Sequence, residues 1–89
     1  MKHLLKIENN YLDRLKSGKK RAEVRWNDRD YQLGDVLQFR DHRDGRLPPV
    51  GDPEYYIYFR VTHIHSGLGL LSGYVLMSVE RMASDEVCK

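Results

Sequence analysis

The spacing of apolar residues changes near the start of the chain, from a helical period to a strand period. Leu12 and Leu15 lie three positions apart and predict the apolar stripe of a helix of about eight residues. Asn9 or Asn10 is suited to cap the N-terminus of this helix, and Gly18 is suited to end it in the left-handed conformation. Because so short a helix is marginal alone in water, we expect it to cover one opening of a small sheet or barrel.

Alternating apolar and polar residues predict about five strands. A first strand over residues 4–7 precedes the helix, and residues 21–26 alternate strictly after it, with Ala22, Val24 and Trp26 on one face. The remaining strands are predicted over residues 36–40, 55–64 and 73–80. One early helix and about five strands with short turns indicate a mainly β (α+β) domain, a small barrel without βαβ units.

The length of 89 residues suits one domain with one hydrophobic core. We predict a single domain over residues 1–82 and a loose C-terminal tail over residues 83–89. The loop between the third and fourth strands contains Asp-Gly, Pro-Pro and Gly-Asp-Pro sequences. Its central part, residues 43–53, is long for so small a domain, and loops of that length are more often functional than mere connectors.

The composition excludes several classes of protein. With 40% hydrophobic and 31% charged residues, the chain is typical of soluble globular proteins. No apolar run approaches the roughly 20 residues that cross a bilayer, and charge interrupts the N-terminus too early for a signal peptide. We therefore expect a cytoplasmic protein without a membrane partner. The single Cys88 cannot form an internal disulfide, and nothing in the sequence indicates a cofactor.

Positive charge is concentrated in the first half of the chain. Residues 1–46 contain 12 Lys/Arg and 8 Asp/Glu, a net charge of +4, whereas residues 47–89 contain 3 and 5, a net charge of −2. This modest asymmetry favours an anionic partner.

The junction between the helix and the second strand carries the densest group of ionisable side chains. Glu23 and Arg25 lie two apart on a strand and share one face, so Glu23 can hold the Arg25 guanidinium by a charge-assisted hydrogen bond. A fixed guanidinium can grip a phosphate or stack on a base, and a lysine can act as a compact charge or as an acid or base. The alternative is a solvated strand face without a role. The group consists of Lys19, Lys20, Arg21, Glu23 and Arg25.

The polar loop after this strand supplies two further candidates. Asn27 can pair with a base edge through two hydrogen bonds, and Arg29 can contact a phosphate or stack on a base. Asn and Asp are also ordinary turn residues, so a purely structural role for this loop is equally well supported.

Two histidines raise the question of a metal. His63 and His65 lie two apart on a predicted strand and could chelate an ion together. Metal sites usually need three or more protein ligands, and only His42 or distant acids could complete this one. Because both histidines follow the core parity of their strand, we expect no metal site.

The string Gly18-x-Lys20-x-x-Glu23-x-Arg25 resembles the signature of the ASCH superfamily. The resemblance implies a PUA-like barrel and a link to RNA or modified-nucleotide biology. Several segments are similar to a small uncharacterised bacterial and phage branch of that superfamily: residues 15–20, 23–25, 27–37, 67–70 and 73–78. Together they span nearly the whole chain except the loop over residues 43–53.

One ASCH-like branch consists of small amidohydrolases that act on acetylated cytidine, and this chain resembles it at Gly18, Lys20 and Arg25. That branch has a threonine at the position of Glu23, and a catalytic glutamate in a segment before the last strand. Here the corresponding residues 66–72 contain no acid. A hydrolase with Lys20 and Glu23 as its candidate catalytic residues would therefore lack the acid/base glutamate of that branch, unless Glu23 or Glu54 takes its place.

These observations favour a binding module whose basic cleft, between residues 18–25 and the loop over residues 43–53, accepts RNA or a modified nucleotide. Catalysis is the less favoured hypothesis, and it would take the form of nucleoside amidohydrolase activity. A third hypothesis is an accessory scaffold that binds a protein partner through the loop. The expected ligand-binding residues are Lys19, Lys20, Glu23, Arg25, Asn27 and Arg29.

Overall fold

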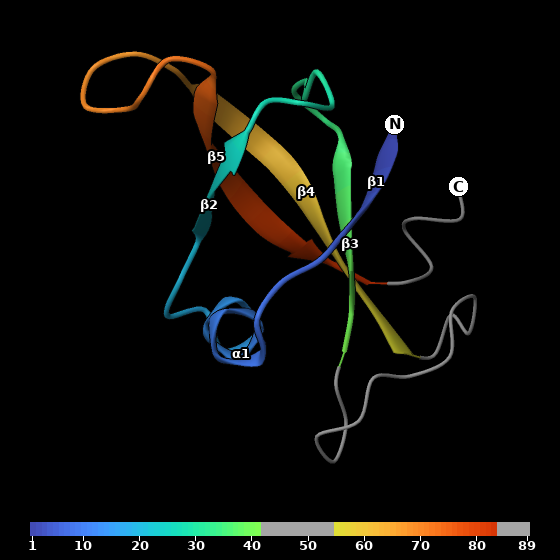
Figure 1. The fold of residues 1–89 in the computed structure, drawn as a ribbon. Helices are drawn as coiled ribbons and strands as arrows, with labels where there is room; N and C mark the ends of the chain where they lie inside the picture. The colour runs from blue at the N-terminus through green and yellow to red at the C-terminus, as the bar shows by residue number, and fades with distance from the viewer. Residues whose placement is uncertain (42–54, 84–89) are drawn as a thin grey trace.

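The computed structural model describes residues 1–41 and 55–83 of the chain. The loop over residues 43–53, and the tail from residue 84 onward, lie outside the described residues. The predicted fold class is confirmed, because the domain is mainly β with one short helix after the first strand (Figure 1). The elements are β1 (Lys2–Leu5), α1 (Asn9–Ser17), β2 (Ala22–Trp26), β3 (Val36–Arg40), β4 (Tyr56–His65) and β5 (Tyr74–Met82).

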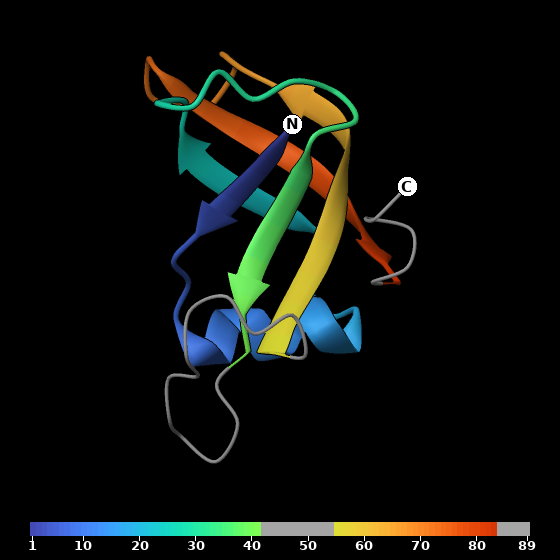
Figure 2. The same ribbon diagram turned by 90° about the vertical axis from the view of Figure 1, so that its right-hand side faces the viewer.

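The five strands form one sheet in the order β1-β3-β4-β5-β2. β1 runs parallel to β3, and every other neighbouring pair is antiparallel. The sheet curls strongly, so its two edge strands, β1 and β2, lie on either side of an open seam (Figures 1 and 2). The architecture is therefore a half-barrel, closed on the side of β3, β4 and β5 and open between β1 and β2.

Helix α1 lies across one end of the half-barrel (Figure 2). Its buried residues are Leu12 and Leu15, as the apolar stripe predicted. The predicted end of the helix is also confirmed, because Gly18 adopts a φ of 81° and its N–H donates to the Leu15 carbonyl. The predicted asparagine cap is wrong: the N-cap residue is Glu8, which makes no side-chain capping bond. The Asn10 side chain instead accepts a hydrogen bond from the adjacent Tyr11 N–H.

The core lies between the concave face of the sheet and α1. Ile57, Phe59 and Val61, predicted to share the core face of the fourth strand, are buried, but Tyr58 between them is buried as well, so the alternation is only partly confirmed. A β-bulge between Val61 and His63 then breaks this alternation, and His63 is exposed. The largest fully buried side chains are Phe39, Leu12, Leu37, Met77 and Val61.

The first strand is shifted from its predicted position. It covers Lys2–Leu5 instead of residues 4–7, because Lys2 to Leu5 pair with Val36 to Phe39. The strand ends before Lys6, whose carbonyl oxygen accepts a hydrogen bond from the Arg25 guanidinium at 2.6 Å. Backbone pairing of β1 therefore ends at Leu5, and the next carbonyl along the chain is bound by a side chain from β2.

Asp35 connects the N-terminal strand to the turn before β3. Its carboxylate lies 2.8 Å from Nε2 of the buried His3 and 3.1 Å from the Met1 amino group, and it accepts the Gln32 N–H. Burial alone would raise the pKa of Asp35, but the hydrogen bonds from His3, the Gln32 backbone and the terminal amino group outweigh burial. The pKa of Asp35 consequently lies below its usual value of 3.8.

Candidate functional site

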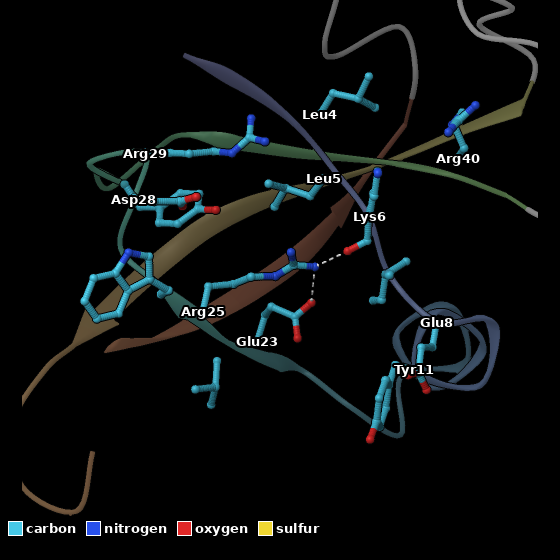
Figure 3. A pocket seen from close by; sticks show the side chains of 14 residues that line it. Leu4, Leu5, Lys6, Glu8, Tyr11, Glu23, Arg25, Asp28, Arg29 and Arg40 are labelled. Carbon is cyan, nitrogen blue, oxygen red and sulfur yellow. Dashed lines mark hydrogen bonds and ion pairs between the residues drawn. The ribbon is translucent and has the colours of Figure 1, made fainter. Parts of the chain in front are cut away.

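The seam between the two edge strands forms a cleft of about 650 Å³ (Figure 3). One wall comes from β1 and the segment that leads into α1, and the other from β2 and the loop after it. This volume is within the range of small-molecule binding sites. The cleft is lined by residues 4–8, Tyr11, residues 23–26, Asp28, Arg29, Tyr31 and Arg40.

Glu23 is at the centre of an ion-pair chain in this cleft. Its side chain is buried, and one oxygen accepts a hydrogen bond from Lys20 Nζ at 2.8 Å. The other oxygen lies 3.3 Å from the Arg25 guanidinium. The same guanidinium nitrogen donates to the Lys6 carbonyl across the seam, as the dashed lines in Figure 3 show. Glu23 is thus in direct contact with both Lys20 and Arg25.

The apolar side chains of β2 are more exposed than its one acidic residue, which is the reverse of a solvated charged face. Glu23 is only 6% exposed, whereas Val24 and Trp26 are 49% and 54% exposed. The interpretation of Arg21, Glu23 and Arg25 as a solvent-facing stripe is therefore wrong for Glu23. The physical reason is that β2 borders the open seam, where its charged side chains bind one another and a backbone carbonyl.

Trp26 is a half-exposed aromatic ring at the edge of the cleft. Its ring packs edge-on against Tyr74 with centroids 5.4 Å apart. It also covers Gly73, where an added Cβ would lie 2.2 Å from the nearest ring atom. A glycine at position 73 is thus required both for its φ of 88° and for the position of the indole.

Gly73→Ala is expected to cost about 1 kcal/mol through its positive φ and also to displace the Trp26 ring. Gly69→Ala is a matched control, because Gly69 has the same φ of 88° but nothing within 4 Å of its Cβ position. Trp26 is the only tryptophan, so its fluorescence reports the displacement directly. The emission maximum should shift in Gly73→Ala and stay unchanged in Gly69→Ala. An equal shift in both variants would contradict the packing described here.

The loop after β2 contributes some of its predicted residues and not others. Arg29 lines the cleft together with Asp28, as predicted for Arg29. Asn27 does not line it: its side-chain oxygen accepts the Tyr31 N–H at 2.9 Å, which stabilises the turn. Lys19 is exposed and is also absent from the cleft lining. The cleft lining therefore includes Glu23, Arg25 and Arg29 of the predicted residues. Lys20 does not line the cleft and is connected to it through Glu23, whereas Lys19 and Asn27 lie outside.

Tyr31 is a cleft residue that the sequence analysis did not select. It is 4% exposed, and no described residue lies within hydrogen-bonding distance of its hydroxyl. An unsatisfied buried hydroxyl costs about 1–3 kcal/mol. Burial raises the pKa of Tyr31 and outweighs the opposing effect of Arg25, so at neutral pH the hydroxyl keeps its proton. One feature of the sequence could have indicated this residue: Tyr31 is the single aromatic residue in the loop over residues 27–35.

The charges around the cleft nearly balance. Glu8, Glu23 and Asp28 provide three acidic side chains. The four basic side chains are Lys6, Arg25, Arg29 and Arg40. Such a balance suits a ligand that carries one or a few negative charges better than a long polyanion.

The described residues offer no metal centre and no membrane span. Across residues 1–41 and 55–83, no three His, Cys, Asp or Glu side chains gather closely enough to hold an ion. His63 is exposed and His65 partly exposed, while His42 lies outside the described residues. In the same part of the chain, no helix is long and apolar enough to span a bilayer.

Comparison with known proteins supports the fold and a family. Residues 2–79 match the family described as "Domain of unknown function (DUF3850)". The chain belongs to this family. The crystal structure of hypothetical protein PH0355 is similar to it, with a TM-score of 0.59 and 18% identity over 92% of this chain and 100% of that chain. At this identity the similarity concerns the fold alone. No curated protein matches the chain.

Proposed function

We propose that this domain is an RNA- or nucleotide-binding module of the ASCH/PUA-like kind, and that the open seam is its binding site. The observation that carries the proposal is the fixed Arg25 guanidinium in a cleft of about 650 Å³. The resemblance of residues 18–25 to the ASCH signature supports the same ligand class. The fold alone would not, because one fold serves many functions.

Three residues of the cleft have defined roles in this proposal. Arg25 is oriented by Glu23 and by the Lys6 carbonyl, so its remaining donors can grip a phosphate or a base edge. Arg29, at the mouth, meets phosphate. Trp26 offers a half-exposed ring for stacking, which contributes about 1–3 kcal/mol per base in single-strand binding proteins.

Titration with short single-stranded RNAs at low salt tests the proposal. Arg25→Ala is expected to weaken binding at least tenfold, because it removes a charge-assisted contact of roughly 1.5–3 kcal/mol. Arg14→Ala is the control, since Arg14 is an exposed arginine of α1 that does not line the cleft. Circular dichroism of each variant verifies that the fold is intact. If no RNA binds the parent protein, or if both variants bind equally, the proposal is wrong.

The salt dependence of binding gives a second readout in the same titration. Each phosphate contact to a single strand contributes a slope of about −0.7 to the plot of log affinity against log salt. With nearly balanced charge in the cleft, we expect a slope that corresponds to about one or two phosphates. A much steeper slope would indicate that the RNA follows another surface.

Hydrolysis of a modified nucleoside is the alternative that concerns the same residues. Lys20 and Glu23 are in contact at 2.8 Å, as a proton-transfer pair would be. However, both Glu23 oxygens already bind cations, and residues 66–72 contain no second acid. Incubation with a panel of acylated nucleosides, followed by mass spectrometry, decides the matter. Unchanged substrate at high protein concentration rules out the hydrolase.

A further inference from the structure

The Tyr31 hydroxyl is a buried hydrogen-bonding group without a partner among the described residues, and it belongs to a side chain that lines the cleft. Buried hydroxyls are nearly always satisfied, so each exception calls for an explanation. A group that is unsatisfied in the unliganded protein can be satisfied by a ligand. The position of this hydroxyl in the proposed binding site makes it the strongest unexplained feature of the domain.

The tyrosine is held rigidly from both ends. Its backbone N–H donates to the Asn27 side chain at 2.9 Å, and its ring packs edge-on against His3 with centroids 4.9 Å apart. His3 is fixed in turn by its 2.8 Å contact with Asp35. These contacts restrain the backbone and the ring of Tyr31, so the position of the hydroxyl is set before a ligand arrives, and a ligand atom reaches it only after a movement at the mouth of the cleft.

The surroundings of the hydroxyl favour a ligand atom that accepts a hydrogen bond. Two cations, Arg25 and Arg29, and two acids, Asp28 and Glu23, act on Tyr31, and Arg25 has the largest effect of the four. All four line the cleft. The nearest acid in the ion-pair chain, Glu23, already uses both oxygens to accept hydrogen bonds. A carbonyl oxygen suits this position better than a phosphate, because a buried ionic group would lose more hydration.

A nucleobase would enter the cleft with the edge farthest from its sugar. The sugar and phosphate stay at the mouth near water, so the deepest substituent is the one at position 4 of a pyrimidine or position 6 of a purine. Uracil and guanine carry a carbonyl there, whereas cytosine and adenine carry an amino group. A hydroxyl of a cleft-lining residue that met this edge of the base would tell these two classes apart.

We propose that Tyr31 is a specificity-determining residue, whose hydroxyl donates a hydrogen bond to the carbonyl of a single uracil or guanine base inserted between β1 and β2. This inference rests on the proposed function. The hydroxyl is closed to water in the unliganded structure, so binding requires a side chain at the mouth to move. Arg29 is exposed and lines the same cleft as Tyr31, and an exposed side chain moves at little cost.

The test compares Tyr31→Phe with the parent protein, with the RNA tetramers U4 and C4 at low salt as probes. The parent is expected to bind U4 about tenfold more tightly than C4, the effect of one well-placed hydrogen bond. Tyr31→Phe should bind U4 about tenfold more weakly and lose the preference. Its melting temperature should be unchanged or higher, because the variant removes a hydroxyl that has no partner in the folded protein.

The other outcomes would contradict either the role of Tyr31 or the proposed function. If Tyr31→Phe binds U4 as tightly as the parent, or the parent does not distinguish U4 from C4, Tyr31 does not read the base, although the proposed function stands. If the parent binds neither tetramer, the proposed function fails first. A clear fall in melting temperature would mean that the hydroxyl has a structural partner, and this too would overturn the proposal.

Discussion

Glu23→Ala is expected to lower the free energy of unfolding by about 3 kcal/mol, the largest effect we predict for a single residue. The variant removes the one carboxylate that neutralises both Lys20 and Arg25 in a largely buried position. Removal of one partner from a buried ion pair costs about 3–5 kcal/mol, and partial exposure of Lys20 and Arg25 places this case at the lower end. Urea denaturation followed by Trp26 fluorescence measures the change.

Glu80→Ala provides the control for this measurement, because Glu80 is an exposed glutamate on β5. Its effect should stay within about 0.5 kcal/mol. The double variant Glu23→Ala with Lys20→Met should be less destabilised than the sum of the single variants, since no unpaired lysine remains. If Glu23→Ala is as stable as Glu80→Ala, the ion-pair chain does not contribute to stability.

Asp35→Asn is expected to destabilise the domain by about 2 kcal/mol at pH 7, through weaker hydrogen bonds to His3 and the Gln32 N–H. The difference should depend on pH. The pKa of Asp35 is lowered in the folded protein, so its carboxylate contributes fully above the usual value of 3.8. As the pH falls below that value, the unfolded chain binds the proton first, and the contribution disappears once the pH is below the folded pKa.

The measurement is the free energy of unfolding of the parent and of Asp35→Asn between pH 7 and pH 3. The two proteins should differ most at pH 7 and should converge in acid. Asp30→Asn serves as the control, because Asp30 is exposed in the same loop and asparagine tolerates its φ of 50°. A difference that stays constant across this range would contradict the lowered pKa.

Local features of the sequence predict most of the architecture. Gly18 ends the helix because only glycine readily adopts the required φ, and Val36–Arg40 is a strand in both the prediction and the structure. The alternation of Ile57, Phe59 and Val61 likewise identifies a core face. These signals are reliable because each depends on the residue itself and its near neighbours.

The candidate site is predicted less completely because it depends on contacts between distant residues. The sequence indicates that Glu23 can hold Arg25, but not that Arg25 reaches the Lys6 carbonyl from β2. Alternation alone predicts that the apolar face of β2 is turned inward, whereas Glu23 is buried and Val24 and Trp26 are half exposed. The wall formed by β1 and the unsatisfied Tyr31 hydroxyl also emerge only once the sheet has curled.

The open seam also bears on the solubility of the domain. Along an antiparallel edge strand, the backbone N–H and C=O groups of alternate residues point toward the neighbouring strand and away from it. The Arg21 carbonyl and the Asn27 N–H point toward the β5 side of β2, so the backbone groups of Val24 point away from β5. An exposed edge of this kind can recruit a strand from another molecule and begin aggregation. Glu23 and Arg25 lie on this edge strand, and charged side chains on an edge strand are one of the features that oppose such pairing. The charges that orient the proposed ligand contact thus also lie on an edge where charge opposes the pairing of sheets from two molecules.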